Sequence, residues 1–310
     1  MNPRISVVIS SHQGERDISH ALLSVLDQTY GEFEIIVVDD GSTDGTARIV
    51  EAHALVDPRV RLLTLPHNRG PSVGRNAGLE QCRGQWVALL DADDAYAPRR
   101  LEALLEWAES TGADMVSDSL YLVSYPDMVP MGTAPRPPIR PPGRFIGVED
   151  YLYGNDFSSG SLSYGYLKPM IRRDFLRSHG IWFRDNLRLC EDFHFYLDCL
   201  FAGAKWWLLP DAHYYYAVRR SSLSRKGSPD AIGAAAMHSA FELTASGLPN
   251  VARYLLKRRH NNIERTIAYL RARKHAKRMN LVGAFRELAR RPDLVAMVRG
   301  FMSRIMPRRI

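Results

Sequence analysis

Carboxylate side chains follow two apolar segments of this sequence, and they are the residues best placed to do chemistry. One segment runs Val37-Val38-Asp39-Asp40-Gly41-Ser42, and the other runs Leu89-Leu90-Asp91-Ala92-Asp93-Asp94. A strand that ends in acidic residues delivers them to the carboxyl edge of an α/β sheet, where ligands bind. Two such ends, about fifty residues apart, predict one site that holds a nucleotide and a divalent cation.

Asp91 and Asp93 are the expected cation-binding pair. Side chains two residues apart on a strand point the same way, so both carboxylates can face one cavity. Mg²⁺ and Mn²⁺ prefer oxygen ligands and commonly bridge carboxylates to substrate phosphates. The alternative interpretation is an acidic turn in which Asp94 caps a helix.

Asp39 and Asp40 have a different expected task. A carboxylate after a buried strand can accept hydrogen bonds from a base N–H or from a ribose hydroxyl, and Gly41 permits a tight turn. The alternative is an ordinary strand-to-helix turn with Ser42, Thr43 and Asp44 as caps, and we expect Asp44 to cap in either case.

The elements that must position these acids alternate in type over the first 120 residues. Short β-rich runs predict strands, and segments with apolar residues at helical spacing predict helices. This alternation is typical of an α/β fold with a mainly parallel sheet and helices on both faces. The expected strands are Ile5–Ser10, Phe33–Val38, Val60–Leu65, Gln85–Leu90 and a strand from Met115, and the expected helices are Asp17–Gln28, Thr43–Val50, Ser72–Gln81 and Pro98–Glu109.

The alternation stops at a proline-rich segment, where seven of the 18 prolines fall between Pro126 and Pro142. Proline disrupts helices and strands, so we expect a mobile flap without regular structure. Beyond it we expect the helical or mixed segments Val148–Tyr153, Leu167–Arg177 and Leu189–Leu200, and the short strands Lys205–Leu209 and Tyr214–Val218.

Charge divides the chain into an acidic body and a basic tail. Val251–Ile310 contains 17 Lys and Arg against 3 Asp and Glu, whereas the preceding residues carry 24 basic and 31 acidic side chains. This asymmetry points to a polyanionic partner for the tail, either a membrane surface or nucleic acid. The polar segment Ser221–Asp230 is the expected boundary, with one domain over 1–228 and a basic helical extension over 229–310.

Three cysteines without zinc-type spacing are expected to be free thiols in a reducing cytoplasm. Neither a signal peptide nor a membrane-spanning helix is expected, because no long uninterrupted apolar stretch is present.

Four motifs occur in order along the first hundred residues. They are Ser6-Val7-Val8-Ile9-Ser10, Val38-Asp39-Asp40-Gly41-Ser42-Thr43-Asp44, Asn68-Arg69-Gly70 with Gly74-Arg75-Asn76-x-Gly78, and Asp91-Ala92-Asp93-Asp94. Together they resemble the motifs of the inverting family 2 glycosyltransferases of the GT-A fold. The resemblance covers about residues 4–225 and also implies single sugar addition, because the Gln-x-x-Arg-Trp signature of processive synthases is absent.

This resemblance implies a UDP-sugar donor, a Mn²⁺ or Mg²⁺ cofactor and a set of donor-binding residues. Ser10, His12 and Glu15 would lie along the nucleotide pocket. His12 departs from the tyrosine often found at its position, and its imidazole can still stack on a base. Asp40 would recognise the uracil edge with Asp39 near the ribose, and Arg75 would lie by the diphosphate or the base. Asp91 and Asp93 would hold the ribose and the metal, with Asp93 as the metal ligand.

The second half is expected to supply the base and the acceptor side. An inverting transfer needs a carboxylate opposite the leaving diphosphate. In the Glu191-Asp192 pair, the family's base position falls on Asp192, and the alternative is that both acids only favour the helix dipole.

The segment from Gly165 to Arg173 resembles the acceptor region of succinoglycan-type exopolysaccharide glucosyltransferases. Lys168, Arg172 and Arg173 could meet an acceptor diphosphate or be solvated charges on a helix. Arg219 could touch phosphate, and we expect His213 to be structural rather than a metal neighbour.

The basic tail favours contact with an anionic membrane surface, because apolar residues recur among its Lys and Arg at helical spacing. The enzyme would then lie in the cytoplasm, peripheral on the inner face of the cell membrane, near an acceptor saccharide on a polyprenyl diphosphate. The alternative is a solvated basic face packed on the catalytic domain. Two other functions stay open. One is a nucleic-acid-binding protein that acts through this tail, although no recognition motif is visible, and the other is a nucleotide-sugar sensor without turnover.

Overall fold

The computed structural model describes residues 3–134, 139–155, 163–219, 237, 242–244 and 247–289. The chain divides into two compact units, one of Met1–Asn155 with Ser159–Arg225 and the other of Asp156–Ser158 with Lys226–Ile310. The expected boundary after residue 228 lies outside the described residues and stays a prediction.

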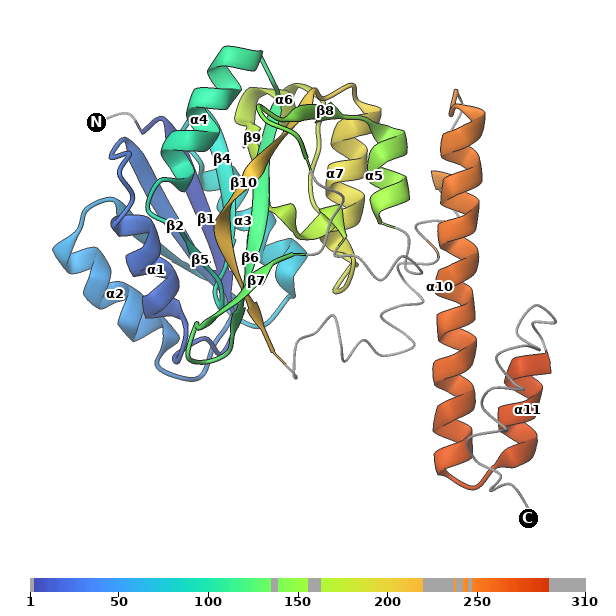
Figure 1. Cartoon of the computed structure of the whole chain (residues 1–310). Helices are drawn as coiled ribbons and strands as arrows, with labels where there is room; N and C mark the ends of the chain where they lie inside the picture. The colour runs from blue at the N-terminus through green and yellow to red at the C-terminus, as the bar shows by residue number, and fades with distance from the viewer. Residues whose placement is uncertain are drawn as a thin grey trace. The chain divides into compact units, whose positions relative to one another are not determined.

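One mixed sheet forms the centre of the first unit (Figure 1). Its strand order is β3-β2-β1-β4-β9-β6-β10-β5, with β7 paired to β6 and β8 paired to β10. The strands are β1 (Ile5–Ser11), β2 (Phe33–Asp39), β3 (Val60–Thr64), β4 (Trp86–Asp91), β5 (Ala95–Tyr96), β6 (Met115–Ser124), β7 (Pro130–Thr133), β8 (Arg144–Ile146), β9 (Met170–Arg172) and β10 (Trp206–Val218).

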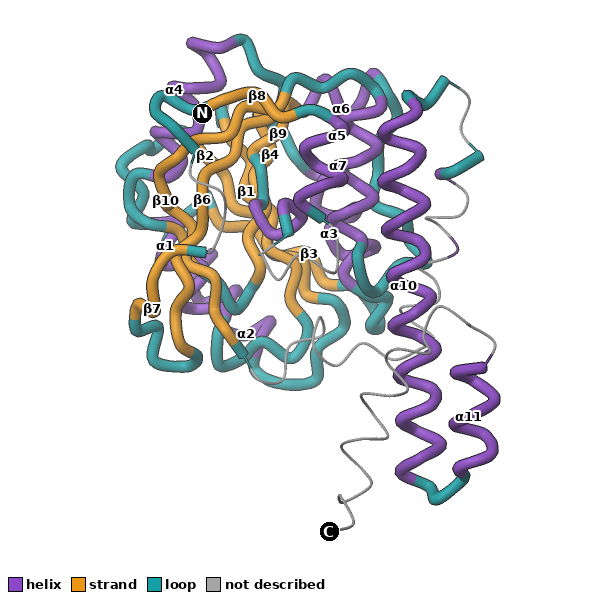
Figure 2. Tube along the Cα trace, turned by 45° about the vertical axis from the view of Figure 1, so that its right-hand side comes forward, coloured by secondary structure: helices purple, strands orange, loops and turns teal. Residues whose placement is uncertain are grey.

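Helices surround this sheet and connect its strands (Figure 2). Helix α3 packs on β1 and β2, α2 on β3, and α4 on β6 and β10. The helices of this unit are α1 (Ile18–Leu26), α2 (Thr46–Val56), α3 (Pro71–Gln81), α4 (Arg100–Thr111), α5 (Val148–Gly154), the 3₁₀ turn η1 (Tyr164–Leu167), α6 (Arg173–Ser178) and α7 (Glu191–Phe201).

The first four strands of the path are parallel, and they contain the acidic segments. Strand β2 is buried along its whole length, as expected for a parallel strand with both faces covered. Strand β1 pairs in parallel with β2 and β4, and β2 pairs in parallel with β3. The α/β fold with a mostly parallel central sheet is therefore confirmed.

The structure differs from the expectation in the second half of the sheet. Pro130–Thr133 form strand β7 against β6, so the proline-rich segment is not wholly irregular, because prolines are tolerated on an edge strand. The two short strands expected at Lys205–Leu209 and Tyr214–Val218 are one strand, β10, with irregular register between Leu208 and Tyr214.

The second unit contains α10 (Asn250–Lys277) and α11 (Leu281–Ala289). Ala268 and Ala272 of α10 pack against Ala284 and Leu288 of α11 in a small apolar cluster. The helical character expected of this region is confirmed there, whereas residues 290–310 of the basic tail lie outside the described residues. None of the helices in the described ranges has the length and hydropathy that a membrane-spanning segment needs.

Candidate active site

The carboxyl ends of β1, β2 and β4 bring the two acidic segments to one edge of the sheet. Ser10 on β1 lies opposite Val38 of β2 and Asp91 of β4, and Ser11 lies opposite Asp39. Adjacent strands are about 4.8 Å apart, so the acidic ends flank β1 on either side. The sheet alone therefore explains why segments distant in sequence share one site.

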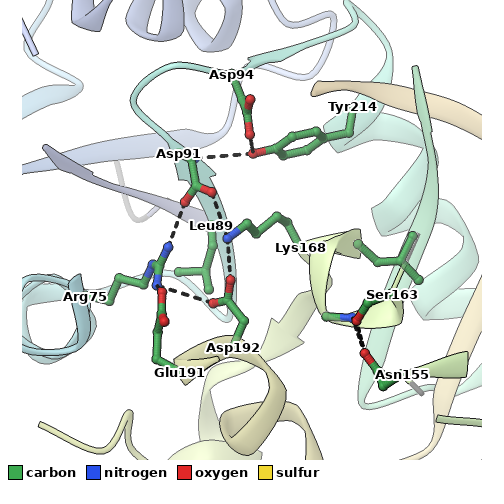
Figure 3. Close-up of polar contacts among 12 residues, drawn as sticks. Arg75, Leu89, Asp91, Asp94, Asn155, Ser163, Lys168, Glu191, Asp192 and Tyr214 are labelled. Carbon is green, nitrogen blue, oxygen red and sulfur yellow. Dashed lines mark hydrogen bonds and ion pairs between the residues drawn. The ribbon is translucent and has the colours of Figure 1, made fainter. Parts of the chain in front are cut away.

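Five charged side chains form a cluster at this edge, which we call the charge cluster (Figure 3). Its members come from both halves of the first unit. Arg75 lies on α3, Asp91 ends β4, Lys168 follows η1, and Glu191 and Asp192 open α7. The expected donor-side acid Asp91 and the expected base Asp192 are thus brought together.

The two cations of the charge cluster each contact more than one carboxylate. The Arg75 guanidinium lies 2.8 Å from Asp91 Oδ1, 2.8 Å from Glu191 Oε1 and 3.3 Å from Asp192 Oδ1. The Lys168 ammonium lies 2.6 Å from Asp192 Oδ2 and 2.9 Å from Asp91 Oδ2. Asp192 Oδ1 is buried and accepts no hydrogen bond within the described ranges, so it keeps lone pairs for a proton.

Burial and mutual attraction set the ionisation of this cluster. Burial favours the neutral form of Asp91, but Lys168 and Arg75 outweigh it and hold the pKa of this carboxyl well below its usual range. The pKa of Glu191 is raised, because burial and the neighbouring Asp192 together exceed the stabilisation by Arg75. Carboxyl groups of different acidity therefore lie side by side, as is common in active sites.

Asp39, Asp40 and His12 lie together beside β1. Asp40 is buried, and its two carboxylate oxygens accept hydrogen bonds from the backbone N–H groups of Arg69 and Gly70 at 2.8 and 2.7 Å. His12 Nδ1 lies 2.9 Å from the Asp40 carbonyl oxygen. Asp39 Oδ1 accepts the backbone N–H of Ser42 at 3.2 Å. These acids thus order the turns where a nucleotide is expected, and each oxygen retains a second lone pair.

Two glycines let helices approach the strand ends closely. A Cβ at Gly74 would lie 2.3 Å from Ser10 Oγ, and a Cβ at Gly45 would lie 2.4 Å from Glu15 Oε1. The start of α3 can therefore press on β1 and carry Arg75 to Asp91. Asp44 accepts the Thr46 N–H at 3.0 Å and so satisfies a donor of the first turn of α2, although the N-cap position itself is Gly45.

Asp93 lies beside the cluster and pairs with Arg219 from the end of β10. The Arg219 Nε lies 2.9 Å from Asp93 Oδ2, and its Nη2 lies 2.7 Å from Asp17 Oδ2. The guanidinium also covers the Tyr125 ring at 3.7 Å. Burial and the nearby Asp91 raise the pKa of Asp93 against the opposing effect of Arg219. Arg219, expected as a possible phosphate contact, thus lies beside the expected metal ligand Asp93, and its contact with phosphate stays a prediction.

Asp94 connects β4 to β10 instead of capping a helix. Its carboxylate accepts the Tyr214 hydroxyl at 2.7 Å and the Ala217 N–H at 2.8 Å. The Tyr214 hydroxyl in turn accepts the backbone N–H of Asp91 at 3.3 Å (Figure 3). Asp94 therefore fixes the segment that carries the other two acids.

Two further basic residues lie apart from the cluster. Arg172 pairs in β9 with Trp86, at the opposite end of β4 from Asp91, and forms an ion pair with Asp114 at 2.6 Å. Its side chain is 46% exposed. The ring of His213 lies 3.6 Å from Asp118, and its backbone N–H donates to the same carboxylate, as expected of a structural histidine.

Comparison with known proteins identifies the family. Succinoglycan biosynthesis protein ExoO of Rhizobium meliloti is 31% identical to this chain over 284 residues, which are 92% of this chain and 80% of ExoO. The model of glycosyl transferase family 2 matches residues 6–146. The chain belongs to glycosyl transferase family 2.

Solved structures with the same fold confirm the GT-A architecture of this family 2 protein. S. aureus TarS residues 1–349 align with a TM-score of 0.68 and 21% identity, over 91% of this chain and 80% of that one. A mannosyltransferase of Pyrobaculum calidifontis, solved with GDP-Man and Mn²⁺, aligns with a TM-score of 0.60 and 18% identity, over 99% of this chain and 81% of that one. At these identities the likeness shows the fold alone.

The residues around Asp93 fit a hard divalent cation bound jointly with a ligand. In the described part of the chain no group of three or more His, Cys, Asp or Glu could by itself hold a metal ion. Asp93 is a part-exposed carboxylate beside another carboxylate, with Arg219 as its cationic partner. Mg²⁺ typically uses one or two carboxylates together with substrate phosphates, so this donor set suits a metal that arrives with a nucleotide diphosphate.

Several contributors to this family 2 site were missed by sequence reasoning. Asp17, Tyr125 and the Arg100–Asp118 ion pair beneath Lys168 belong to no motif, and only their contacts show their parts. The position of Glu191 next to the expected base Asp192 could have indicated a part in the site. Its ion pair with Arg75 could not be predicted, because it depends on how α3 and α7 meet in the fold.

Proposed function

We propose that this protein is a metal-dependent inverting glycosyltransferase that moves a hexose from a UDP-sugar to a lipid-linked saccharide. UDP-glucose is the first donor to test. The observation that carries the proposal is the meeting of Asp91 and Asp192 on the same lysine and the same arginine. This juxtaposition gives one site both a donor-side acid and an acid for the acceptor.

The donor half of the proposal rests on the first four strands. Asp39, Asp40 and His12 would surround the uridine, with Ser10 and Glu15 along the same pocket. Arg75, buried and cationic beside Asp91, would offset the charge of the diphosphate. TarS, which shares this fold, has been solved with UDP-GlcNAc, and this supports a UDP-sugar donor.

The acceptor half rests on Asp192. In the proposed transfer, the acceptor hydroxyl oxygen forms a bond to the anomeric carbon, and the bond from that carbon to the β-phosphate oxygen breaks. The hydroxyl proton passes to Asp192 Oδ1, and UDP leaves with the electron pair. Because attack and departure occur on opposite faces of the sugar, its configuration inverts.

Asp93 would be the protein ligand of a Mn²⁺ or Mg²⁺ ion. When bound, such an ion supplies positive charge that stabilises the leaving diphosphate. Arg219, which contacts Asp93, would remain beside the phosphates and add a second cation on the same side.

The biosynthetic setting is proposed from the relatives. ExoO is a succinoglycan biosynthesis protein by name, and this supports a role in exopolysaccharide or other cell-surface polysaccharide synthesis. We propose a growing saccharide on a polyprenyl diphosphate as the acceptor.

We also propose that residues 229–310 form an extension that binds anionic membranes. Around the α10–α11 turn the described residues present exposed basic side chains at Arg271, Arg273, Lys274, Lys277, Arg278 and Arg286. The same turn exposes the apolar side chains of Met279, Leu281, Val282 and Phe285, which are 67–84% exposed. Apolar side chains bordered by basic ones suit the surface of an anionic bilayer. The enzyme would then act in the cytoplasm, peripheral on the inner face of the cell membrane.

The first experiment measures UDP release from a panel of UDP-sugars with a synthetic farnesyl-diphosphate-linked glucose as acceptor, in Mn²⁺ and in chelator. We expect metal-dependent release from at least one donor. Asp192→Asn should keep UDP affinity within about threefold and lose about 10²–10⁴-fold in turnover, because the isosteric amide cannot take the proton.

Asp174→Asn is the matched control, since this carboxylate is 77% exposed on α6 and should turn over like the wild type. Normal turnover by Asp192→Asn would remove Asp192 as the base. UDP binding without release from any donor would instead favour a nucleotide-sugar sensor.

A further inference from the structure

Lys168 is a buried lysine at the centre of the charge cluster. Its side chain is 2% exposed, and its ammonium lies between Asp192 Oδ2 and Asp91 Oδ2 at 2.6 and 2.9 Å (Figure 3). An ammonium without partners is costly to bury, and two carboxylate contacts offset that cost. The lysine therefore belongs to the interior of the site and not to its surface.

The neighbouring carboxylates stabilise the protonated form of Lys168. Burial disfavours the ammonium, but Asp192 and Asp91 outweigh it and raise the pKa of Lys168 above its ordinary value. The charge cluster contains three carboxylates and only two cations. Removal of Lys168 would leave Arg75 alone among three acids, so the charge of this one side chain matters to all of them.

The backbone at Lys168 is fixed by a second buried ion pair. Lys168 has a positive φ of 46°, an uncommon conformation for a side chain of this size. Its carbonyl oxygen accepts a hydrogen bond from Arg100 at 2.8 Å, and Arg100 pairs with Asp118 at 3.0 Å, both side chains being fully buried. Such a support holds the side chain in the cluster.

We propose that Lys168 is a positioning residue for the base Asp192. The Lys168 ammonium holds Asp192 by Oδ2 and links it to Asp91 on the donor side. Asp192 Oδ1 then remains to take the proton of the acceptor hydroxyl. This inference rests on the proposed function and assigns one residue of its site. It differs from the interpretation of Lys168 as a contact to the acceptor diphosphate. A side chain that is buried and already bound to two carboxylates has little capacity for a third anion.

The variant that tests this role is Lys168→Met, assayed with UDP-glucose and farnesyl-diphosphate-linked glucose. We expect kcat to fall about 10²-fold with donor KM changed by less than about threefold, because the base is misplaced and not the donor. We also expect acceptor KM to stay within about threefold of the wild type, because Lys168 contacts the base and not the acceptor diphosphate.

Two further variants separate charge from packing. Lys168→Arg keeps the cation in a different shape and should recover part of the kcat that Lys168→Met loses. Lys205→Met removes an exposed lysine and should change neither kcat nor KM. Loss of packing alone would lower the fraction of Lys168→Met that binds UDP, so kcat is calculated per UDP-binding molecule.

A measurement without substrate keeps the test independent of turnover. With ¹³C-labelled aspartate carboxyls, assigned by Asp192→Asn, the chemical shift of the Asp192 carboxyl should differ between Lys168→Met and the wild type at neutral pH, because the ammonium 2.6 Å from its Oδ2 is lost. Arg75, Glu191, Asp91 and Tyr196 are the other charged or titratable groups that face Asp192. They are the same in both proteins, so the difference reports Lys168.

Three results would overturn the inference. One is an unchanged chemical shift of the Asp192 carboxyl in Lys168→Met. Another is a raised acceptor KM with unchanged kcat, which would restore the acceptor-contact interpretation. The third is the same loss of kcat in Lys168→Arg as in Lys168→Met. A wild-type enzyme that releases UDP from no donor would contradict the proposed function, while the carboxyl signal would still decide whether Lys168 holds Asp192.

Discussion

Arg100 and Asp118 form a fully buried ion pair beneath the active site. Arg100 also packs over the rings of Tyr96 and Tyr214 at 4.3 and 4.9 Å. A buried ion pair adds little net stability when compared with apolar residues of similar size, but removal of one partner leaves the other charge buried without a counterion. This pair therefore makes Lys168 and its surroundings sensitive to a single substitution.

Arg100→Met should lower the free energy of unfolding by about 3–5 kcal/mol near neutral pH, because Asp118 is left without its cation. The difference should narrow as pH falls below about 4. The direction of this pH dependence follows from Asp118 in the wild type. Burial opposes its ionisation, but Arg100 and His213 outweigh burial and lower the pKa of Asp118. The stabilisation by the ion pair is therefore fully present above the pKa of Asp118 in the unfolded protein, and it is lost as pH falls through the lower pKa of the folded protein. Urea unfolding at several pH values measures it.

Arg99→Met is the neighbouring control, since the Arg99 side chain is 65% exposed, and it should unfold like the wild type. A destabilisation by Arg100→Met that stays constant from neutral to acidic pH would contradict the charge argument and leave only lost packing.

At this scale, sequence predicted residue types better than residue contacts. Asp91, Arg75 and Asp192 were found because they sit in motifs, and the structure brings them together. For Lys168 the sequence leaves open an acceptor contact or a solvated charge, because a sequence shows neither burial nor ion-pair partners. Arg172 follows it closely in the sequence, yet lies at the far end of β4, because β9 runs antiparallel to that strand.

At the scale of elements, α3 decides how close the glycine motif comes to the sheet. A Cβ at Gly78 would lie 2.4 Å from Val8 Cγ1 and 3.2 Å from Val38 Cγ2. Both valines are buried and β-branched, so they have few other rotamers. The helix can therefore carry Arg75 to the charge cluster only while position 78 has no side chain.

Gly78→Ala should destabilise the protein by about 1–3 kcal/mol through overpacking between α3 and the strands. It should also weaken UDP binding, because α3 must move and Arg75 with it. Thermal unfolding and calorimetry with UDP measure the two effects. Gly31→Ala, at a position with nothing within 4 Å of the added Cβ, should leave both unchanged. Equal stability of the two variants would show that α3 can shift without cost.

The elements that sequence predicted well are those with local signals. Strands β1, β2 and β4 are apolar runs, and α1 has apolar residues at helical spacing, so these local patterns located them. Strand β9 depends on pairing with distant residues of β4 and β6, and pairing of that kind leaves no pattern within a short segment. Strand β7 forms a hairpin with the adjacent β6, but the proline-rich composition around it pointed away from regular structure.

At the scale of the whole molecule, charge separates two functions along one chain. The residues before Val251 carry a net negative balance, whereas the remainder carries 17 basic and 3 acidic residues. With the proposed lipid-linked acceptor, the acidic part of the chain would be repelled by an anionic bilayer unless another part attracted it. The exposed side chains at the α10–α11 turn have the composition for that attraction.

Leu281→Ser with Phe285→Ser should reduce flotation with phosphatidylglycerol vesicles by about tenfold or more, because two large apolar side chains no longer leave water on binding. Both residues are exposed on α11, so the substitutions leave its contacts with Ala268 and Ala272 in place. Lys274→Gln with Lys277→Gln should also weaken flotation, because the attraction to anionic lipids is reduced. High salt screens this attraction, so it should weaken flotation of the wild type as these lysine substitutions do, whereas it does not mimic the loss of the apolar side chains.

The matched control is Leu55→Ser with Val56→Ser, which removes exposed apolar side chains of similar size from α2 and should float like the wild type. Flotation on purely zwitterionic vesicles should be weak for every variant, since the basic side chains would have no partner. If the α11 variant binds anionic vesicles as well as the α2 control does, the turn does not enter the bilayer. The basic residues alone, or a protein partner, would then account for any membrane association.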